Sequence, residues 1–565
     1  MPHVITQACC NDASCVFACP VNCIHPTPDE PGFATSEMLY IDPDACVDCG
    51  ACVRACPVDA IVAHSKVAPQ QLPFVEINRS YYPDRPEGIK LPPTSKLAPV
   101  LPAAEVPQRG AFPLTVAIVG SGPAAMYAAD ELLTQPGVLV NMFEKLPTPY
   151  GLVRAGVAPD HQRTKLVARL FDEISRRRGF QFFLNVEVGR HVSHADLLQH
   201  HHAVLYASGA LHDRRLDVEC MGIAGTGTAT QVVGWYNGHP DFADVPVDLS
   251  HERVVIVGNG NVALDVARVL TADPDRLART DIADYALAAL RESAVTEVVI
   301  AARRGPISSA FTLPELIGLT QTGEVVLNSD DHARVRDALA DLSAGDAVAR
   351  QKLEVLAKLG DASAPIARPR IRLAYHLTPS RIVGDDRCTA IEFTDTDTAL
   401  VSVIEAGMVL SSIGYHGTPI ADLPFDEGEG VVPNRDGRVM DPITSQRVPG
   451  AYVSGWIKRG TNGFIGSNKS DSLKTIQSLA ADYNSGLLSE PIAGPRAIAR
   501  LVRARQPDVI DAAGWAAIDK AEISRGEAQG RPRVKFTQIP AMLAQANARA
   551  KKSLIAQLRY AVRRS

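Results

Sequence analysis

The sequence contains no run of eighteen or more consecutive apolar residues, so no membrane-spanning helix is expected. It begins Met-Pro-His-Val-Ile-Thr, without the basic and apolar regions of a secretory signal peptide, so we expect a cytoplasmic protein without a disulfide framework. No cysteine lies between Cys56 and Cys220, and only Cys388 follows. The other nine of the 11 cysteines are therefore concentrated in the first 56 residues.

The second group of these cysteines has a spacing typical of iron–sulfur proteins. It reads Cys46-x2-Cys49-x2-Cys52-x3-Cys56-Pro, which allows successive thiolates to close around an iron–sulfur cube. A zinc ribbon uses C-x2-C pairs and lacks the C-x3-C-P ending. In modules with two clusters, the fourth cysteine of one run binds the other cluster, so we expect the two segments to fold over each other.

The first group lacks the C-x2-C-x2-C run and has only Cys15-x3-Cys19-Pro, so one corner of its cluster has no ligand. Residues 1–66 therefore resemble seven-iron bacterial ferredoxins, in which Cys23 matches a cysteine that is not a ligand. The resemblance implies a [3Fe–4S] cluster on Cys9, Cys15 and Cys56, and a [4Fe–4S] cluster on Cys19, Cys46, Cys49 and Cys52. Cys9 and Cys15 are separated by five residues where the family has seven, and Cys10 is adjacent. The choice between Cys9 and Cys10, and between a three-iron and a second four-iron cluster, stays open.

The net charge of −6 is confined to this cysteine-rich segment. Residues 1–66 contain eight acidic and two basic residues, whereas the rest of the chain has 55 of each. An acidic electron carrier docks on a basic surface through such complementarity. The charge pattern predicts a protein partner and no nucleic acid.

The length of 565 residues predicts three or four domains. Residues 67–113 contain ten prolines, which favours an extended, semi-rigid linker without regular structure. The basic tail, residues 491–565, is predicted to be helical. From Arg531 onward it has nine Lys or Arg and no acid, which indicates either a solvated face or a docking surface for the acidic module.

A dinucleotide-binding motif follows the linker. The apolar segment 114–119 is a predicted buried strand, followed by Gly120-Ser-Gly122-Pro-Ala-Ala125 and an apolar helix. Gly120 permits the tight turn, Gly122 lets a pyrophosphate approach the backbone, and Ala125 permits close helix–strand packing. Glu144 ends the next predicted strand, where an acid binds a ribose 2′-hydroxyl. This motif suits FAD.

The pattern recurs at Gly258-Asn259-Gly260-Asn261-Val262-Ala263, after the predicted strand 253–257. The next strand ends in Arg303-Arg304 instead of an acid. Two guanidinium groups bind a 2′-phosphate that a carboxylate would repel, so this fold is predicted to bind NADPH. Two dinucleotide folds imply hydride transfer between nicotinamide and flavin.

No C-x4-C pair follows Glu144, so the electrons cannot leave through a dithiol, and the iron–sulfur module is the predicted exit. The segments 149–161, 258–265, 303–306 and 455–460 resemble the signatures of adrenodoxin-reductase-type ferredoxin–NADP reductases over roughly residues 114–540. With the cysteine module, the chain is similar to bacterial members with a fused ferredoxin. The implied fold class is α/β, with two Rossmann-like domains, glutathione-reductase-like FAD and NADP folds, preceded by a small α+β ferredoxin domain.

The resemblance also implies domain limits and site residues. The FAD fold spans 114–212 and 411–490 and is split by the NADP fold, 213–410. Catalytic residues would be His161, near the redox end of the flavin, and Trp456. Predicted FAD contacts are Gly122, Ala124, Glu144, Leu152, Val188, Trp456, Gly463, Phe464 and Ile465, of which Gly463 also approaches the nicotinamide. Predicted NADP contacts are Arg214, Asn259, Gly260, Asn261, Val262, Arg303, Arg304 and Glu315. Gly318 replaces a second acid found in the family. His200-His201-His202 is predicted to be a solvated turn and not a metal site.

The predicted function is therefore that of an NADPH:ferredoxin oxidoreductase. NADPH would supply a hydride to FAD, and single electrons would pass through the clusters to a ferredoxin or another one-electron acceptor protein. One alternative is a subunit like the small subunit of glutamate synthase, although its cysteine domain is longer and helical. A second, non-enzymatic alternative is a redox or iron sensor.

Overall fold

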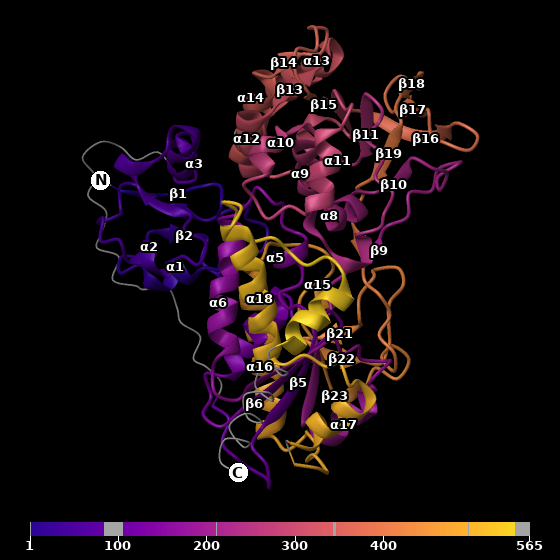
Figure 1. Ribbon diagram of the computed structural model, residues 1–565. Helices are drawn as coiled ribbons and strands as arrows, with labels where there is room; N and C mark the ends of the chain where they lie inside the picture. Colours follow the sequence, from indigo (N-terminus) through magenta and orange to yellow (C-terminus); the bar gives the residue numbers. More distant parts are fainter. Residues whose placement is uncertain (1, 84–104, 211, 343–345, 495, 549–565) are drawn as a thin grey trace.

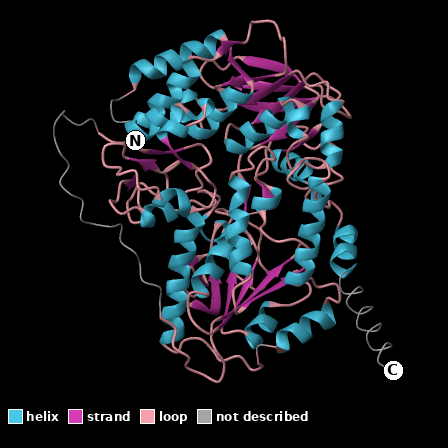
Figure 2. Ribbon diagram, turned by 60° about the vertical axis from the view of Figure 1, so that its left-hand side comes forward, coloured by secondary structure: helices cyan, strands magenta, loops and turns pink. Residues whose placement is uncertain are grey.

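The computed structural model describes residues 2–83, 105–210, 212–342, 346–494 and 496–548. Two sheets, one parallel and one mostly parallel, are flanked by helices and lie one above the other, and the cysteine module sits at the side of both (Figures 1 and 2). The predicted fold class is confirmed by this arrangement and by the relatives described below. In the described part of the chain no helix is both long and apolar enough to cross a membrane.

The lower sheet in Figure 1 is built from two distant parts of the chain. Its strand order is β21 (Asn434–Arg435), β22 (Arg438–Met440), β23 (Arg447–Val453), β8 (Ala203–Tyr206), β5 (Thr115–Val119), β6 (Leu139–Glu144) and β7 (Phe180–Leu184). The strands from β23 to β7 are parallel and nearly continuous in apolar residues, because helices cover both faces. Its helices are α4 (Pro123–Leu132), α5 (Leu152–Ala155), α6 (Val167–Ser175), α7 (His194–His200), α15 (Trp456–Arg459) and α16 (Ser467–Asn484), with α4 packed against α16.

The upper sheet is parallel throughout. Its order is β10 (Thr226–Thr228), β19 (Met408–Ser411), β11 (Arg253–Val257), β12 (Glu297–Ala301), β15 (Arg370–Ala374), β13 (Glu324–Leu327) and β14 (Gly360–Asp361). Its helices are α8 (Ala229–Asn237), α9 (Asn261–Thr271), α10 (Pro274–Leu277), α11 (Asp284–Arg291), α12 (Leu313–Thr322), α13 (Ser329–Asp341) and α14 (Ala347–Ala357). An antiparallel sheet of β16 (Leu377–Val383), β17 (Ala390–Asp395) and β18 (Val401–Glu405) lies at its edge.

The chain passes from the lower sheet to the upper sheet and back through two adjacent strands. β9 (His212–Asp213) pairs antiparallel with β20 (Tyr415–His416). Because these two crossings are hydrogen-bonded to each other, they place the loops of both sheets around a common space. That space contains the cavity described below.

The cysteine module folds its two cysteine groups over each other, as the spacing predicts. Its strands pair antiparallel, β1 (His3–Ile5) with β4 (Ile61–Ala63) and β2 (Ile24–His25) with β3 (Tyr40–Ile41). The short helices α1 (Ser14–Ala18) and α2 (Ala51–Ala55) pack together. The pairing of β1 with β4 brings together the two ends of residues 3–63, which therefore form one small domain.

The prediction that residues 67–113 have no regular structure is wrong for the beginning of this segment. A 3-10 helix (Pro69–Gln71) and α3 (Pro73–Ser80) form there, because Pro69 and Pro73 occupy first-turn positions where a missing amide costs nothing. Asn78 on α3 is buried and accepts hydrogen bonds from the amides of Ile5 and Ile41. Helix α3 thus belongs to the module, and residues 84–104 lie outside the described part of the chain.

The basic tail also differs from its prediction. Its helices are α17 (Ala497–Arg505) and α18 (Ala512–Glu527). Arg531 and Lys535 are buried instead of solvated, and they pair with Asp284 and Asp281 of the upper domain. These charges close the junction between the two large domains and do not touch the cysteine module. Arg533 pairs with Asp519 and Glu522, and the six basic residues from Arg549 onward lie outside the described residues.

The triple histidine is not a solvated turn. His201 and His202 are buried between α7 and β8. His201 makes hydrogen bonds to the carbonyl of Leu197 and to Asn141, and His202 Nδ1 accepts one from the amide of Thr115. Burial lowers the pKa of His201 to about 4, which favours the neutral ring. The prediction failed because a run of three polar residues does not show, in the sequence alone, which side chains point toward the sheet.

Candidate redox site

The first dinucleotide motif forms the turn between β5 and α4. Gly120 has a φ of +98°, and a Cβ there would lie 2.5 Å from the carbonyl oxygen of Ala207, so only glycine fits. Gly122 caps α4, and a Cβ on it would meet no atom within 4 Å. The first turn of α4 therefore presents its amides to open space, which is the arrangement that a pyrophosphate requires.

Glu144 ends β6 and reaches back to the same turn. Its Oε2 accepts hydrogen bonds from the hydroxyl of Ser121 at 2.6 Å and from the amide of Ser121 at 3.1 Å. Burial raises the pKa of the carboxyl, and the Ser121 hydroxyl opposes that rise. The carboxylate is thus held beside the glycine turn. Two further predicted contacts from this part of the chain are Leu152, which is exposed at the start of α5, and Val188, which is half-buried beside Val192.

The chain returns to this turn after β23, through Gly455. A Cβ on Gly455 would lie 2.7 Å from the Cβ of Ala124, so the late segment packs directly on the first motif. Asp471 accepts hydrogen bonds from the Gly455 amide and from Lys458, both at 2.7 Å, and thereby fixes the start of α15. Trp456 follows, and its ring stacks on Tyr415 with centroids 5.4 Å apart. The packing brings Gly122, Ala124 and Trp456 together from opposite ends of the sequence.

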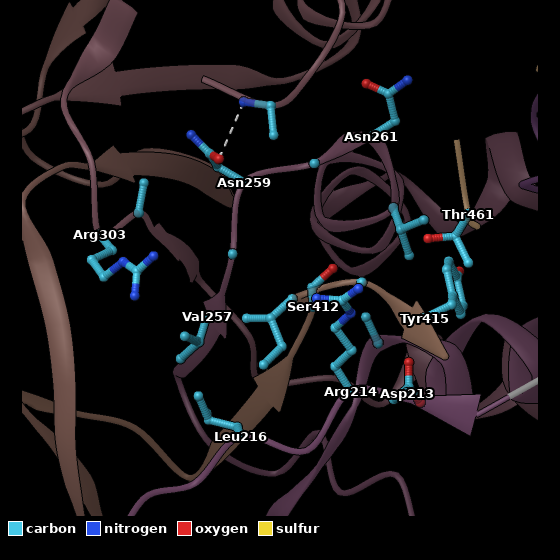
Figure 3. Close-up of a pocket in the computed structure, with 18 of the residues that line it drawn as sticks. Asp213, Arg214, Leu216, Val257, Asn259, Asn261, Arg303, Ser412, Tyr415 and Thr461 are labelled. Carbon is cyan, nitrogen blue, oxygen red and sulfur yellow. Dashed lines mark hydrogen bonds between the residues drawn. The ribbon is translucent and has the colours of Figure 1, made fainter. Parts of the chain in front are cut away.

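A cavity of about 880 Å³ extends from the second dinucleotide motif to the segment after α15 (Figure 3). Eleven predicted residues line it: Arg214, Gly258, Asn259, Gly260, Asn261, Val262, Arg303, Arg304, Trp456, Gly463 and Phe464. Its volume suits an extended dinucleotide. Arg303 and Arg304 are exposed, and Figure 3 shows Arg303 on the opposite side of the cavity from Tyr415, on which Trp456 stacks.

The loops around this cavity are held by side chains of the motif itself. Asn259 Oδ1 accepts a hydrogen bond from the Ala310 amide at 3.3 Å, drawn in Figure 3, and Asn261 Oδ1 accepts one from the Thr312 amide at 2.8 Å. Sequence reasoning missed further lining residues, among them Asp213, Ser412, Tyr415 and Thr461. They lie on β9, directly after β19, on β20 and after α15, and no motif marks them.

Two predicted residues lie outside the lining of this cavity and beside each other instead. His161 Nε2 is 3.7 Å from Glu315 Oε2, and His161 Nδ1 is 4.0 Å from Asp265 Oδ1. Glu315 Oε2 is buried and has no hydrogen-bond partner, and burial raises the pKa of its carboxyl. His161 comes from the lower domain and the two carboxylates from α9 and α12, so this cluster spans the domain junction.

Cysteines of both groups surround a small, partly open space. Cys19, Cys23, Cys46, Cys49 and Cys52 all line it, together with His3. The Sγ atoms of Cys19 and Cys23 are 3.4 Å apart. Hydrogen bonds from the Cys23 thiol lower the pKa of Cys19 and that of Cys46, the latter to about 5. The thiolate form that an iron ligand requires is therefore favoured at two of the predicted ligands, while Cys23 acts as a thiol donor beside them.

The first cysteine group gathers on the other side of the module. Cys9, Cys15 and Cys56 lie close enough for their charges to interact, and Cys10 joins them. Cys10 and Cys15 are buried, and burial raises the pKa of both thiols. The donor set fits an iron–sulfur cluster of either three or four irons, because Cys10 supplies a fourth thiol where the motif has none.

The comparisons with known proteins agree with this geometry. Residues 39–62 match the model of the 4Fe-4S binding domain, and residues 114–303 match that of the pyridine nucleotide-disulphide oxidoreductase. A probable ferredoxin/ferredoxin--NADP reductase of Mycobacterium tuberculosis is 67% identical over 98% of this chain and 96% of its own. The chain belongs to the fused ferredoxin/ferredoxin–NADP reductase family. The predicted resemblance is confirmed.

Members of the wider reductase family cover about three quarters of this chain. The human mitochondrial NADPH:adrenodoxin oxidoreductase is 38% identical over 76% of this chain and 91% of its own. A solved structure of Mycobacterium tuberculosis FprA in complex with NADPH superposes with a TM-score of 0.71 and 39% identity, and covers 77% of this chain and 99% of that one. The fused reductase thus consists of an FprA-like body with an added module.

Proposed function

We propose that this protein is an FAD-dependent NADPH:ferredoxin oxidoreductase that delivers single electrons through its own iron–sulfur module to a ferredoxin or another one-electron acceptor protein. The observation that carries the proposal is the continuity of the site. One cavity links the second dinucleotide motif to Trp456, Gly463 and Phe464, and the segment holding these residues packs on the first motif through Gly455.

The residues present fit two different dinucleotides. Around the first motif, Gly122 and the α4 amides would hold a pyrophosphate, and Glu144 would accept a hydrogen bond from a ribose hydroxyl, as FAD requires. Around the second, Arg303 and Arg304, with Arg214 across the cavity, would hold the 2′-phosphate of NADP(H). When bound, the flavin supplies the chemistry that converts a two-electron hydride donor into a one-electron source.

The remaining predicted residues would enclose the cavity, join the two domains and hold the clusters. The stacked rings of Trp456 and Tyr415 would close one end of the cavity to water. His161, with Glu315 and Asp265, would hold the two domains together at their junction, with His161 Nε2 facing Glu315. Cys19, Cys46, Cys49 and Cys52 would bind a [4Fe–4S] cluster, and Cys9, Cys15 and Cys56 a [3Fe–4S] cluster.

The glutamate-synthase-like alternative is less well supported, because the 67% identical relative matches almost the whole chain, module included. Anaerobic stopped-flow mixing with NADPH, recording flavin and cluster absorbance separately, tests the proposal. We expect the flavin band to bleach first and the cluster bands to follow, and NADH to act far more slowly. Cluster bands that stay oxidised after the flavin is reduced would contradict the proposed route and favour the sensor alternative.

A further inference from the structure

The cysteine module is held against the reductase body at a point of close backbone contact. The amide of Gly466 donates a 2.7 Å hydrogen bond to the carbonyl oxygen of Cys10. A Cβ on Gly466 would lie 2.1 Å from the amide nitrogen of Asp12 and 2.4 Å from its Cα. Because these are backbone atoms of the module, any side chain at position 466 would push the module away from the body.

Further polar contacts hold the module at this point and on the upper domain. Lys469, one turn into α16, donates a 2.8 Å hydrogen bond to the hydroxyl of Ser14 and lies 3.9 Å from Asp12. On the upper domain, Glu37 of the module pairs with Lys352 and accepts a 2.7 Å hydrogen bond from the Leu313 amide. The acidic module is therefore fixed to both large domains, and not merely tethered.

The two cysteine groups face in different directions within this fixed arrangement. Cys9, Cys10 and Cys56 pack against the core of the lower domain. Among the ligands predicted for the [4Fe–4S] cluster none joins that core, and Cys49 is exposed. Val47, two residues from Cys49, has 59% of its surface exposed. One group thus faces the flavin domain and the other faces outward.

The cysteines that pack against the lower domain, Cys9, Cys10 and Cys56, lie few bonds away from the predicted flavin contacts. Phe464 and Ile465 are predicted to line the isoalloxazine, and Gly466 is the next residue. A single hydrogen bond leads from its amide to Cys10, which is bonded covalently to Cys9.

From this geometry, and resting on the proposed function, we propose that the two cysteine groups act in a fixed order. The Cys9/Cys15/Cys56 group is the entry: each transfer oxidises the flavin by one electron and reduces this group by one. The group of Cys46, Cys49 and Cys52 with Cys19 is the exit, and it passes that electron to a basic one-electron acceptor protein. The acceptor binds over Val47, Asp44 and Cys49.

The chemistry of the exit surface determines the kind of partner. Val47, two residues before Cys49, offers an exposed apolar contact, and Asp44, three residues before Val47, is also exposed. Residues 1–66 have a net charge of −6, so a partner with basic residues around its own redox centre is favoured. An apolar centre with a charged rim suits a weak, rapidly exchanging electron-transfer complex.

The entry contact is tested by Gly466→Ala, with Gly32→Ala as the control, because a Cβ on Gly32 meets no atom within 4 Å. Stopped-flow reduction by NADPH should bleach the flavin at the wild-type rate. Cluster reduction should slow severalfold, because the rate of electron transfer falls steeply as the flavin and the cysteine group move apart. Hydrogen exchange, which needs no turnover, should show a protected segment 464–469 in wild type and Gly32→Ala and loss of that protection in Gly466→Ala.

Three results would overturn the entry assignment: an unprotected segment in the wild type, protection retained in Gly466→Ala, or cluster reduction at the wild-type rate after protection is lost. If Gly466→Ala does not fold, Lys469→Ala, which removes the bond to Ser14, should show the same two effects more weakly, and no effect would again count against the proposal. Failure of the proposed function is distinguishable, because wild-type protein would then bleach its flavin without any cluster reduction.

The exit surface is tested by Asp44→Lys, with Glu76→Lys as the control. Both residues are exposed acids of the module, but Glu76 lies on α3, at the opposite end from α2 in Figure 1. With cytochrome c as the basic probe, kcat/KM should fall about three- to tenfold for Asp44→Lys at low salt. Glu76→Lys and ferricyanide reduction should be unaffected. Equal losses in both variants, or none in Asp44→Lys, would overturn the exit assignment.

Discussion

The guanidinium of Arg154 donates two hydrogen bonds, of 2.9 and 2.6 Å, to the two carboxylate oxygens of the fully buried Glu522. Arg154 lies on α5 beside the FAD motif, and Glu522 lies on the tail helix α18. Arg533 adds a third contact to the same carboxylate at 3.2 Å. The tail is thereby joined to the flavin domain through a buried charge cluster that has no counterpart in the motifs.

Glu522→Ala should destabilise the protein by about 3–5 kcal/mol, because it leaves buried arginine charges without their partner. Thermal unfolding of the holoprotein, followed by tryptophan and flavin fluorescence, measures this loss. Glu527→Ala, an exposed site at the end of the same helix, is the control. Equal melting temperatures for the two variants would show that the cluster does not stabilise the tail.

The same carboxylate should give stability that depends on pH. Burial opposes its ionisation, but Arg154 and Arg533 outweigh burial and lower the pKa of Glu522. A carboxylate with a lowered folded-state pKa stabilises the fold fully above its unfolded pKa of about 4.3, and this contribution is lost as the pH falls through the folded pKa. Between about pH 5 and pH 3 the wild type should therefore lose more stability than Glu522→Gln, as measured by guanidinium unfolding. Parallel curves would contradict the prediction.

Arg303→Glu should change the choice of nucleotide. It places a carboxylate where we expect the 2′-phosphate and removes a charge-assisted contact worth about 1.5–3 kcal/mol, which corresponds to about tenfold or more in KM for NADPH. KM for NADH should barely change. Arg336→Glu, on the exposed face of α13 and away from the cavity, is the control. Equal losses with both nucleotides would contradict the phosphate assignment.

The iron content should distinguish the two cluster types left open by the sequence. With a three-iron cluster on Cys9, Cys15 and Cys56, the protein should contain about seven irons, and the oxidised form should give a three-iron EPR signal. Cys9→Ser should remove that signal and Cys10→Ser should keep it. Eight irons and a silent oxidised spectrum would instead assign Cys10 as the fourth ligand, because Cys23 lies beside Cys19 in the other group.

Deleting residues 1–82, the module with α3, should separate the two activities of the enzyme. The reductase body occurs alone in FprA of Mycobacterium tuberculosis, which is 39% identical over 76% of this chain and 98% of its own. NADPH-dependent ferricyanide reduction should remain, whereas cytochrome c reduction should fall sharply and return when free ferredoxin is added. Unchanged cytochrome c reduction would show that the module is not the exit.

The restored activity should depend on salt more strongly than that of the intact protein. The free module associates with the body partly through charge, which salt screens over about 8–10 Å. In the intact chain, the covalent connection keeps the module at high effective concentration, and the contacts of Gly466 and Glu37 hold it in place. Equal salt dependence of the two systems would contradict a preformed interface.

The sequence by itself determined the fold class, both dinucleotide motifs and the two cysteine groups. These features depend on local rules: glycines at tight turns, buried apolar strands, and thiolates spaced to close on a cluster. Strands β5 and β11 and helices α4 and α9 accordingly lie where the motifs predict them. The residues at the ends of equivalent strands, Glu144 in one fold and Arg303–Arg304 in the other, also predicted which fold binds FAD and which binds NADPH.

Only the tertiary structure decided what depends on contacts between distant segments. It showed that α3 belongs to the module, because Asn78 meets strands that are far away in the sequence. It buried Arg531 and Lys535 against acids of another domain, although their own segment contains only basic residues. It also placed Cys10 against Gly466, more than 400 residues apart, in a contact that no spacing rule encodes. Such pairings follow from how the domains pack, and packing is a property of the whole chain.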